Sequence, residues 1–141
     1  MANGIRFYSQ ETKYQIRMRG ALRTWLERVV TDHGKQLQDI SIVVCSDEYL
    51  LSVNRQYLNH DYFTDVITFD YGEGETISGD ILLSIDRIRD NAKSLGQSLK
   101  TELHRVIVHG ILHLLGYSDK TQDEQVAMRA KEDYYLTLRE F

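Results

Sequence analysis

The sequence predicts an α+β fold, with a small mixed sheet of four strands and helices mainly on one of its faces. Short β-rich runs alternate with helical patterns up to residue 85, and helical patterns fill most of the chain after it. No repeat, low-complexity stretch or linker rich in Pro, Gly or Ser divides the chain. Its 141 residues suit one ordinary domain, so we expect a single domain over residues 1–141.

The first half of the chain alternates strand and helix signals. A short strand is predicted at residues 5–8, and apolar residues at helical spacing predict a helix over residues 17–33. Residues 40–45 form a β-rich run that is typical of a buried strand. Ser46 or Asp47 is suited to cap a helix that continues to about residue 58.

The second half begins with two further strands and continues as helix. Residues 65–70 alternate in polarity, as a half-buried strand does, and residues 80–85 form another β-rich run. Helical patterns then cover residues 85–95, 102–115 and 123–138. The buried side of the middle helix should carry its leucines Leu112, Leu114 and Leu115.

Composition excludes several classes of protein. Lys and Arg number 17 against 21 Asp and Glu, so the net charge of −4 is unlike that of proteins that bind nucleic acid through bulk charge. A single cysteine excludes an internal disulfide. No apolar run approaches the roughly 18 residues of a membrane span, and residues 1–10 lack the apolar core of a signal peptide. We therefore expect a cytoplasmic enzyme or binding protein with no membrane partner.

The segment from His109 to Asp119 contains a metal-binding pattern. His109 and His113 are four residues apart in a helical stretch. Four residues of α-helix turn by about 400°, so the two rings lie about 40° apart, one turn above each other, and can share one ion. Gly116 follows at a position suited to a left-handed C-terminal cap, which lets the chain return Asp119 to the same ion.

The spacing H-x3-H-x2-G-x2-D is that of the metzincin zinc motif with Asp in place of the third histidine. Two histidines four apart are by themselves more often core or surface residues, but the added glycine and third ligand type favour a metal. Imidazole and carboxylate suit zinc, so we expect one Zn²⁺ per chain on a zincin-like helix. Three protein ligands leave a position for a water molecule, which is typical of catalytic sites. His104 points about 140° away from His109 and should not be a ligand.

Three segments resemble the YbeY family of bacterial rRNA maturation factors: HGILHLLGYSD at 109–119, TDVITFDY at 64–71 and SGDILLSI at 78–85. The resemblance extends over about residues 40–135. Members of the family are single-domain, zinc-dependent endoribonucleases associated with ribosome maturation and quality control. The resemblance implies a zinc site at His109, His113 and Asp119, in a cleft between the sheet and the metal helix.

The chain departs from the family's pattern at three positions. Asp119 replaces a third histidine and is still a competent ligand. Phe63 replaces a proline. Leu58 replaces an arginine, which removes a basic group that could hold phosphate near the metal. Arg55 or His60, a few residues to either side, are candidates to take over this contact.

Other residues are candidates to contact a substrate strand. Arg19 and Arg23 belong to residues 11–28, where five basic residues outnumber two acidic ones. This stretch is either a solvated helix face or a stripe that binds phosphates. Four aromatic residues near the predicted strand 65–70 could stack on bases, although Phe69 is more typical of a core position: Tyr62, Phe63, Phe69 and Tyr71.

The resemblance implies zinc-dependent hydrolysis of single-stranded RNA, in 16S rRNA 3′-end maturation and ribosome quality control. The partners would be rRNA and the ribosome or its assembly factors. The catalytic groups would be a metal-bound water and Asp65, which would act on that water as a base or orient a ligand histidine. A hydrogen-bonding role for Asp65 at the start of a strand is the alternative.

Two other classes of function stay open. Zinc proteases of this spacing have Glu directly after the first histidine, as general base, whereas this chain has Gly110. That difference disfavours a zincin-type peptidase or amide hydrolase. A non-catalytic, zinc-containing ribosome-assembly factor is compatible with the net charge of −4 and with Leu58.

Overall fold

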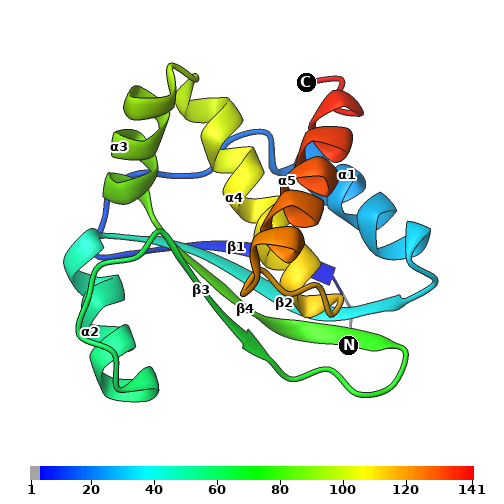
Figure 1. Cartoon of the computed structure of the whole chain (residues 1–141), viewed down its shortest axis with the longest axis horizontal. Helices are drawn as coiled ribbons and strands as arrows, with labels where there is room; N and C mark the ends of the chain where they lie inside the picture. Colours follow the sequence, from blue (N-terminus) through cyan, green and yellow to red (C-terminus); the bar gives the residue numbers. More distant parts are fainter. Residues whose placement is uncertain (1–3) are drawn as a thin grey trace.

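A four-stranded mixed sheet organises the protein (Figure 1). The computed structural model describes residues 4–141. The strands lie in the order β1-β2-β4-β3, with β1, β2 and β4 parallel and β3 antiparallel to β4 at one edge. They are β1 (Gly4–Gln10), β2 (Gln36–Cys45), β3 (Val66–Asp70) and β4 (Thr76–Ser84).

Helices cover both faces of the sheet, but unequally. The helices of residues 4–141 are α1 (Arg19–Asp32), α2 (Asp47–Leu58), α3 (Ile85–Leu95), α4 (Leu99–Leu114) and α5 (Gln122–Thr137). Helices α1, α3, α4 and α5 lie over one face and share the larger hydrophobic core, whereas α2 packs on the opposite face over a smaller one (Figure 1). The predicted α+β class, with helices mainly on one face, is confirmed. No helix within residues 4–141 is long and apolar enough to cross a lipid bilayer.

Side-chain caps begin four of these helices. Ser46, Ser84, Ser98 and Thr121 each accept a hydrogen bond from the backbone N–H three residues further on. The first N–H groups of a helix have no partner inside the helix, so each cap satisfies one of them. Of the two candidates for α2, Ser46 is the cap, and Asp47 is the first helical residue.

The predicted elements differ from the observed ones mainly at their starts. Strands β2 and β4 both begin earlier than expected because their polar ends pair with each other, Gln36 opposite Thr76. Backbone pairing needs no apolar side chain, and polar residues flank the buried Ile77 at the start of β4, so the hydrophobic pattern did not reveal these ends. Helix α4 begins before residue 102 because Ser98 caps it. Helix α1 begins later than expected because Met18 has a left-handed φ of 58°.

Helix α4 packs tightly against the sheet at Gly110. A Cβ atom at this position would lie 2.8 Å from Cγ2 of Ile81 in β4, which is closer than two packed carbon atoms allow. Glycine therefore lets the helix sit directly on the strand. On the buried side of α4, Leu112 and Leu114 are buried as predicted, and Leu115 packs half-buried against the same core.

Leu112→Ala should lower the free energy of unfolding by about 2–5 kcal/mol, because it removes a fully buried side chain from the core beneath α4. Leu95→Ala is the matched control, since Leu95 is 50 % exposed at the end of α3 and should cost much less. Urea unfolding of both variants measures the difference. A loss for Leu112→Ala no larger than that for Leu95→Ala would contradict this packing.

Candidate metal centre

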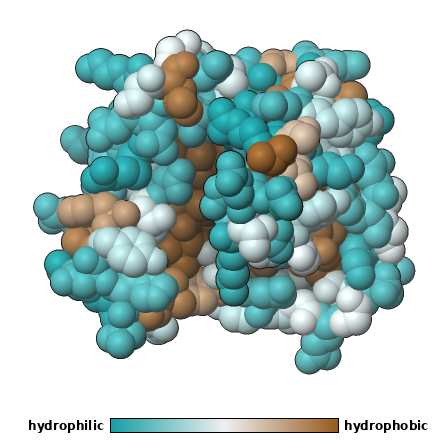
Figure 2. Space-filling model, in the orientation of Figure 1, coloured by the Kyte–Doolittle hydropathy of each residue, from teal (hydrophilic) through white to brown (hydrophobic). Residues whose placement is uncertain are grey.

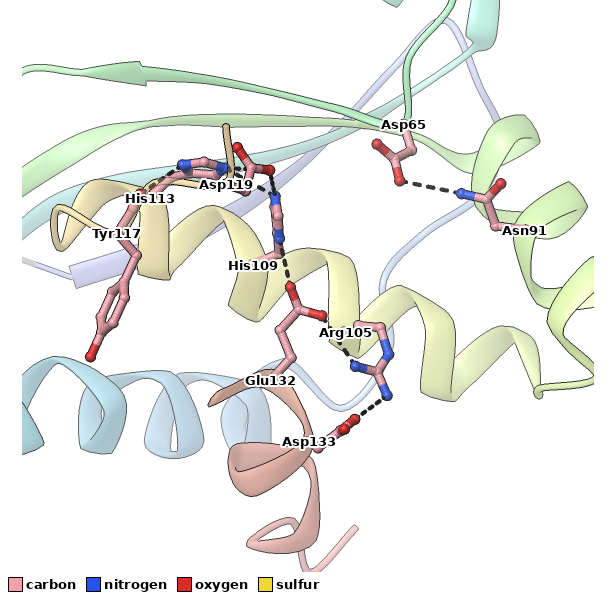
Figure 3. Close-up of polar contacts among 9 residues, drawn as sticks. All are labelled: Asp65, Asn91, Arg105, His109, His113, Tyr117, Asp119, Glu132 and Asp133. Atoms are coloured by element: carbon pink, nitrogen blue, oxygen red, sulfur yellow. Dashed lines mark hydrogen bonds and ion pairs between the residues drawn. The ribbon is translucent and has the colours of Figure 1, made fainter. Parts of the chain in front are cut away.

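The end of α4 and the loop after it bring three ligand-type side chains together. His109 and His113 lie one turn apart on the helix. Gly116 follows with a φ of +105°, which glycine adopts without strain, and the chain turns back there. The turn carries the carboxylate of Asp119 to the two imidazoles (Figure 3). The three residues predicted as ligands are therefore neighbours in space.

The three ligand atoms form a triangle of the size that a zinc ion needs. The Nε2 atoms of His109 and His113 lie 3.0 Å apart, and Oδ2 of Asp119 lies 3.4 Å from each of them. Tetrahedral zinc with bonds of about 2.0–2.1 Å holds its ligand atoms about 3.3 Å apart. Two imidazoles and a carboxylate also match the ligand preference of zinc. The residues present thus fit the ion that the sequence predicts.

Both histidines are oriented through their other ring nitrogen. Nδ1 of His113 lies 3.0 Å from the carbonyl oxygen of Tyr117, which can only accept, so Nδ1 carries the hydrogen and Nε2 keeps its lone pair. Nδ1 of His109 donates to Oε2 of Glu132 at 2.6 Å. Two Nε2 lone pairs and the Asp119 carboxylate therefore face one another, an arrangement that a cation between them stabilises.

Tyr117 is itself held from helix α1. His33 donates from Nδ1 to the carbonyl oxygen of Val29 at 2.7 Å, and its Nε2 accepts from the Tyr117 hydroxyl at 2.9 Å. The ring of His33 also meets that of Tyr117 edge to face. A chain of contacts thus runs from α1 through Tyr117 to the ligand His113.

Sequence reasoning missed Glu132, which orients the other ligand. Glu132 lies on α5 and is only 4 % exposed, with its Oε1 accepting from Nη1 of Arg105 at 3.1 Å (Figure 3). Nη2 of Arg105 donates to Asp133 at 2.6 Å. One sequence signal was available, because an acidic residue here interrupts the apolar stripe of α5 between Met128 and Tyr135.

The protonation of His109 reflects these neighbours. Burial acts to lower the pKa of His109, but the hydrogen bond and charge of Glu132, together with the charges of Asp119 and Asp65, outweigh burial and raise it. The surrounding carboxylates therefore favour a positive charge on or beside this imidazole. A proton and a metal ion would compete for that place.

His104 lies away from the cluster, as its position on the helix predicts. It is buried beside Trp25 and Phe141, and its Nδ1 lies 2.8 Å from Nη1 of Arg139. Burial first, and then the positive charges of Arg139 and Lys100, lower its pKa to about 4. His104 is therefore a neutral core residue.

A pocket of about 360 Å³ opens beside the cluster. On this face of the molecule, Figure 2 shows a furrow with an apolar floor and hydrophilic sides. Most of the side chains that line the pocket are charged or polar: Asp65, Glu102, Arg105, His109, Asp119, Gln125, Arg129 and Glu132, with Val106 and Met128 between them.

Asp65 forms one wall of this pocket. Its Oδ2 accepts from Nδ2 of Asn91 at 3.2 Å, and its backbone carbonyl accepts from the N–H of Ser84. Burial raises the pKa of Asp65, although the neighbouring His109 acts to lower it. A catalytic role for Asp65 and a hydrogen-bonding role at the start of a strand are compatible, because its backbone carbonyl is bonded to β4 while its carboxyl group lines the pocket.

Arg19 and Arg23, the predicted phosphate contacts on α1, are not among the side chains that line this pocket within residues 4–141. Both guanidinium groups lie over the ring of Phe7. Their Nε atoms donate to the backbone carbonyl groups of Ile16 and Ile5. They stay predicted contacts for a more distant part of a substrate strand.

Within residues 4–141, Arg55 and His60 also do not line the pocket. Arg55 pairs with Asp61, and His60 stacks on Tyr62 in the loop before β3. Neither residue therefore replaces, at the cluster of His109, His113 and Asp119, the arginine that the family's pattern has at the position of Leu58.

The four aromatic residues that could stack on bases differ in exposure. Phe69 packs half-buried in the core under α2, whereas three are exposed: Tyr62, Phe63 and Tyr71.

Comparison with known proteins agrees with this architecture. The family model described as endoribonuclease YbeY matches residues 5–139. An endoribonuclease YbeY from Cytophaga hutchinsonii is 50 % identical over 138 residues, covering 97 % of this chain and 96 % of that protein. One from Bacteroides thetaiotaomicron is 50 % identical over 115 residues, covering 82 % and 84 %. The solution structure of TM1509 from Thermotoga maritima is similar with a TM-score of 0.64 and 25 % sequence identity, covering 94 % of this chain and 86 % of that one. The chain therefore belongs to the YbeY endoribonuclease family.

Proposed function

We propose that this protein is a zinc-dependent endoribonuclease that cleaves single-stranded RNA. The observation that carries the proposal is the convergence of three ligand atoms, two imidazole nitrogens and a carboxylate oxygen, beside a polar pocket that His109 and Asp119 line. Family membership supports RNA as the substrate. By the same likeness we propose a cytoplasmic role in 16S rRNA 3′-end maturation and ribosome quality control, with the ribosome or its assembly factors as partners.

In this proposal His109, His113 and Asp119 hold the ion. Zinc bound there supplies a Lewis acid for the phosphoryl group and lowers the pKa of water. Glu132 keeps the hydrogen of His109 on Nδ1, so that Nε2 points into the site. Asp65 accepts the proton that the attacking water releases, and its raised pKa brings it closer to neutral pH, where a general base is most effective.

The packing at Gly110 argues against a zinc peptidase. The general base of such enzymes is the residue directly after the first histidine. In this chain that position faces the sheet, where even a Cβ atom would lie 2.8 Å from Ile81. A glutamate could not be placed there without displacing the side chain of Ile81 or the helix itself. We therefore expect cleavage of an unstructured RNA and none of casein under the same conditions.

Purified protein should contain about one zinc per chain, measured by native mass spectrometry, because the ligand triangle fits one such ion. A chelator should abolish RNA cleavage and added zinc should restore it. A folded protein that binds zinc but does not cleave RNA would support a non-catalytic assembly factor. Cleavage that persists after zinc is removed would contradict the proposal.

Replacement of Asp119 tests the third ligand. Asp119→Ala should lose zinc and activity, since only two protein ligands remain. Asp119→His should still bind zinc, because a histidine occupies this position in the family's pattern. Zinc content and RNA cleavage are measured for both variants. Full zinc occupancy with unchanged activity in Asp119→Ala would show that Asp119 is not a ligand.

Glu132→Gln should weaken zinc binding by about 10- to 100-fold, because it removes the charge that accepts from His109. Asp133→Asn is the matched control: Asp133 contacts the same Arg105 but does not touch a histidine. Competition with a chromogenic chelator measures the zinc affinity of each variant. Equal affinities in the two variants would mean that Glu132 does not position the ligand.

A further inference from the structure

The inner part of the pocket contains a buried carboxyl group that the proposed mechanism does not use. Glu102 lies on α4 two turns before His109 and is only 4 % exposed. Its Oε1 has no hydrogen-bond partner among residues 4–141, although the side chain lines the pocket. An unpaired buried acceptor is costly, so such a group points to a ligand that donates a hydrogen bond.

A second unpaired polar atom lies close by. Nε of Arg105 is buried and has no hydrogen-bond partner within the described part of the chain, while the two terminal nitrogens of the same guanidinium are bound to Glu132 and Asp133. Glu102 and Arg105, which both line the pocket, thus hold an unused acceptor and an unused donor just beneath its surface. A hydroxyl group, which both donates and accepts, is the chemical group that matches such a pair.

The rim of the pocket offers a positive charge. Arg129 lies on α5 one turn after Gln125, and both side chains are exposed and line the pocket. Within residues 4–141 its guanidinium has no ion-pair or hydrogen-bond partner, in contrast to Arg105. The pocket is otherwise rich in carboxylates, so an anionic ligand would be held at this rim rather than at the inner end.

The electrostatics of Glu102 also favour a neutral hydroxyl at the inner end. Burial raises the pKa of Glu102, and the charges of Asp65 and Glu132 act in the same direction, whereas those of Arg105 and Arg129 act to lower it. A second metal ion is a poorer match, because Glu102 does not belong to a group of three metal-type ligands among residues 4–141, as His109 does. A sugar hydroxyl can be bound by the carboxyl group whether or not it carries a proton.

We propose that this pocket is the ribose–phosphate subsite for one nucleotide of the substrate, in which Glu102 binds a 2′-hydroxyl and Arg129 binds a backbone phosphate. The proposal rests on the proposed function and deepens it, since a contact to the 2′-hydroxyl distinguishes RNA from DNA. Arg129 would also supply, from α5, the basic group that Leu58 does not provide. The volume of about 360 Å³ is within the range of small-ligand sites.

The sugar contact is tested with a set of single-stranded RNA oligonucleotides, each carrying one 2′-deoxy substitution at a different position around the cleaved bond. For the zinc-loaded wild type, one substitution should lower kcat/KM by about 10- to 100-fold, because it leaves Glu102 without its donor. Glu102→Met removes the acceptor at similar size, so the penalty at that position should fall below about twofold, with the other positions unchanged. Glu102→Gln, which keeps an amide oxygen, should retain most of the penalty.

Val106→Ala is the matched control for the sugar contact. Val106 lines the same pocket without a polar side-chain atom, so its replacement should leave the profile of 2′-deoxy penalties unchanged. The Glu102 assignment is overturned if Glu102→Met shows the wild-type penalty at every position. If the zinc-loaded wild type does not cleave RNA at all, the proposed function fails and the subsite fails with it, which is a different result.

The phosphate contact is tested by Arg129→Gln. This variant should raise KM several-fold with little change in kcat. The slope of log(kcat/KM) against log(salt concentration) should become shallower by about 0.7–0.9, the contribution of one phosphate contact. Lys93→Gln makes the same charge change on α3, outside the pocket lining within residues 4–141 and outside the basic stretch 11–28, and should alter neither quantity. Equal KM values and equal salt slopes for the two variants would overturn the assignment of the pocket as a ribose–phosphate subsite.

Discussion

The hydrogen bond from Nδ1 of His109 to Glu132 is the interaction on which the site depends. It joins α5 to α4 next to the candidate metal position, and it leaves Nε2 of His109 free to face His113 and Asp119. A carboxylate as deeply buried as Glu132 is costly unless it is paired. Here the imidazole and Arg105 together satisfy it. The same hydrogen bond therefore holds α5 against α4 and orients His109 as a candidate metal ligand.

A second constraint acts from the other side of the same helix. Gly110 lets α4 lie directly on Ile81, so the helix backbone is set at a short distance from β4. His109 and His113 then face the loop that carries Asp119. The feature that seats the helix also removes the place where zinc peptidases have their general base. Gly110 thus allows the close packing of α4 on β4 and, at the same position, leaves out the glutamate that a zinc peptidase would need.

The pocket beside the cluster combines groups that would repel RNA with groups that would bind it. Its carboxylates disfavour a polyanion, and the guanidinium group of Arg129 and a bound metal ion would offset them. Arg105 is occupied by Glu132 and Asp133, whereas Arg129 is not paired within residues 4–141. A protein with a net charge of −4 can therefore bind a strand of RNA through a few local contacts. This is consistent with the absence of bulk positive charge in the sequence.

The sequence by itself determined the order and type of the helices and strands, the two candidates for the cap of α2, and the three residues His109, His113 and Asp119, because these depend on spacing along a short stretch of chain. Only the tertiary structure decided what surrounds them. Glu132 reaches His109 across 23 residues and His33 reaches Tyr117 across 84, and no local periodicity encodes contacts of that range. The same holds for the lining of the pocket: local charge singled out Arg19, Arg23 and Arg55, which stay predicted substrate contacts, whereas the packing of α4 and α5 places Arg105 and Arg129 at the pocket.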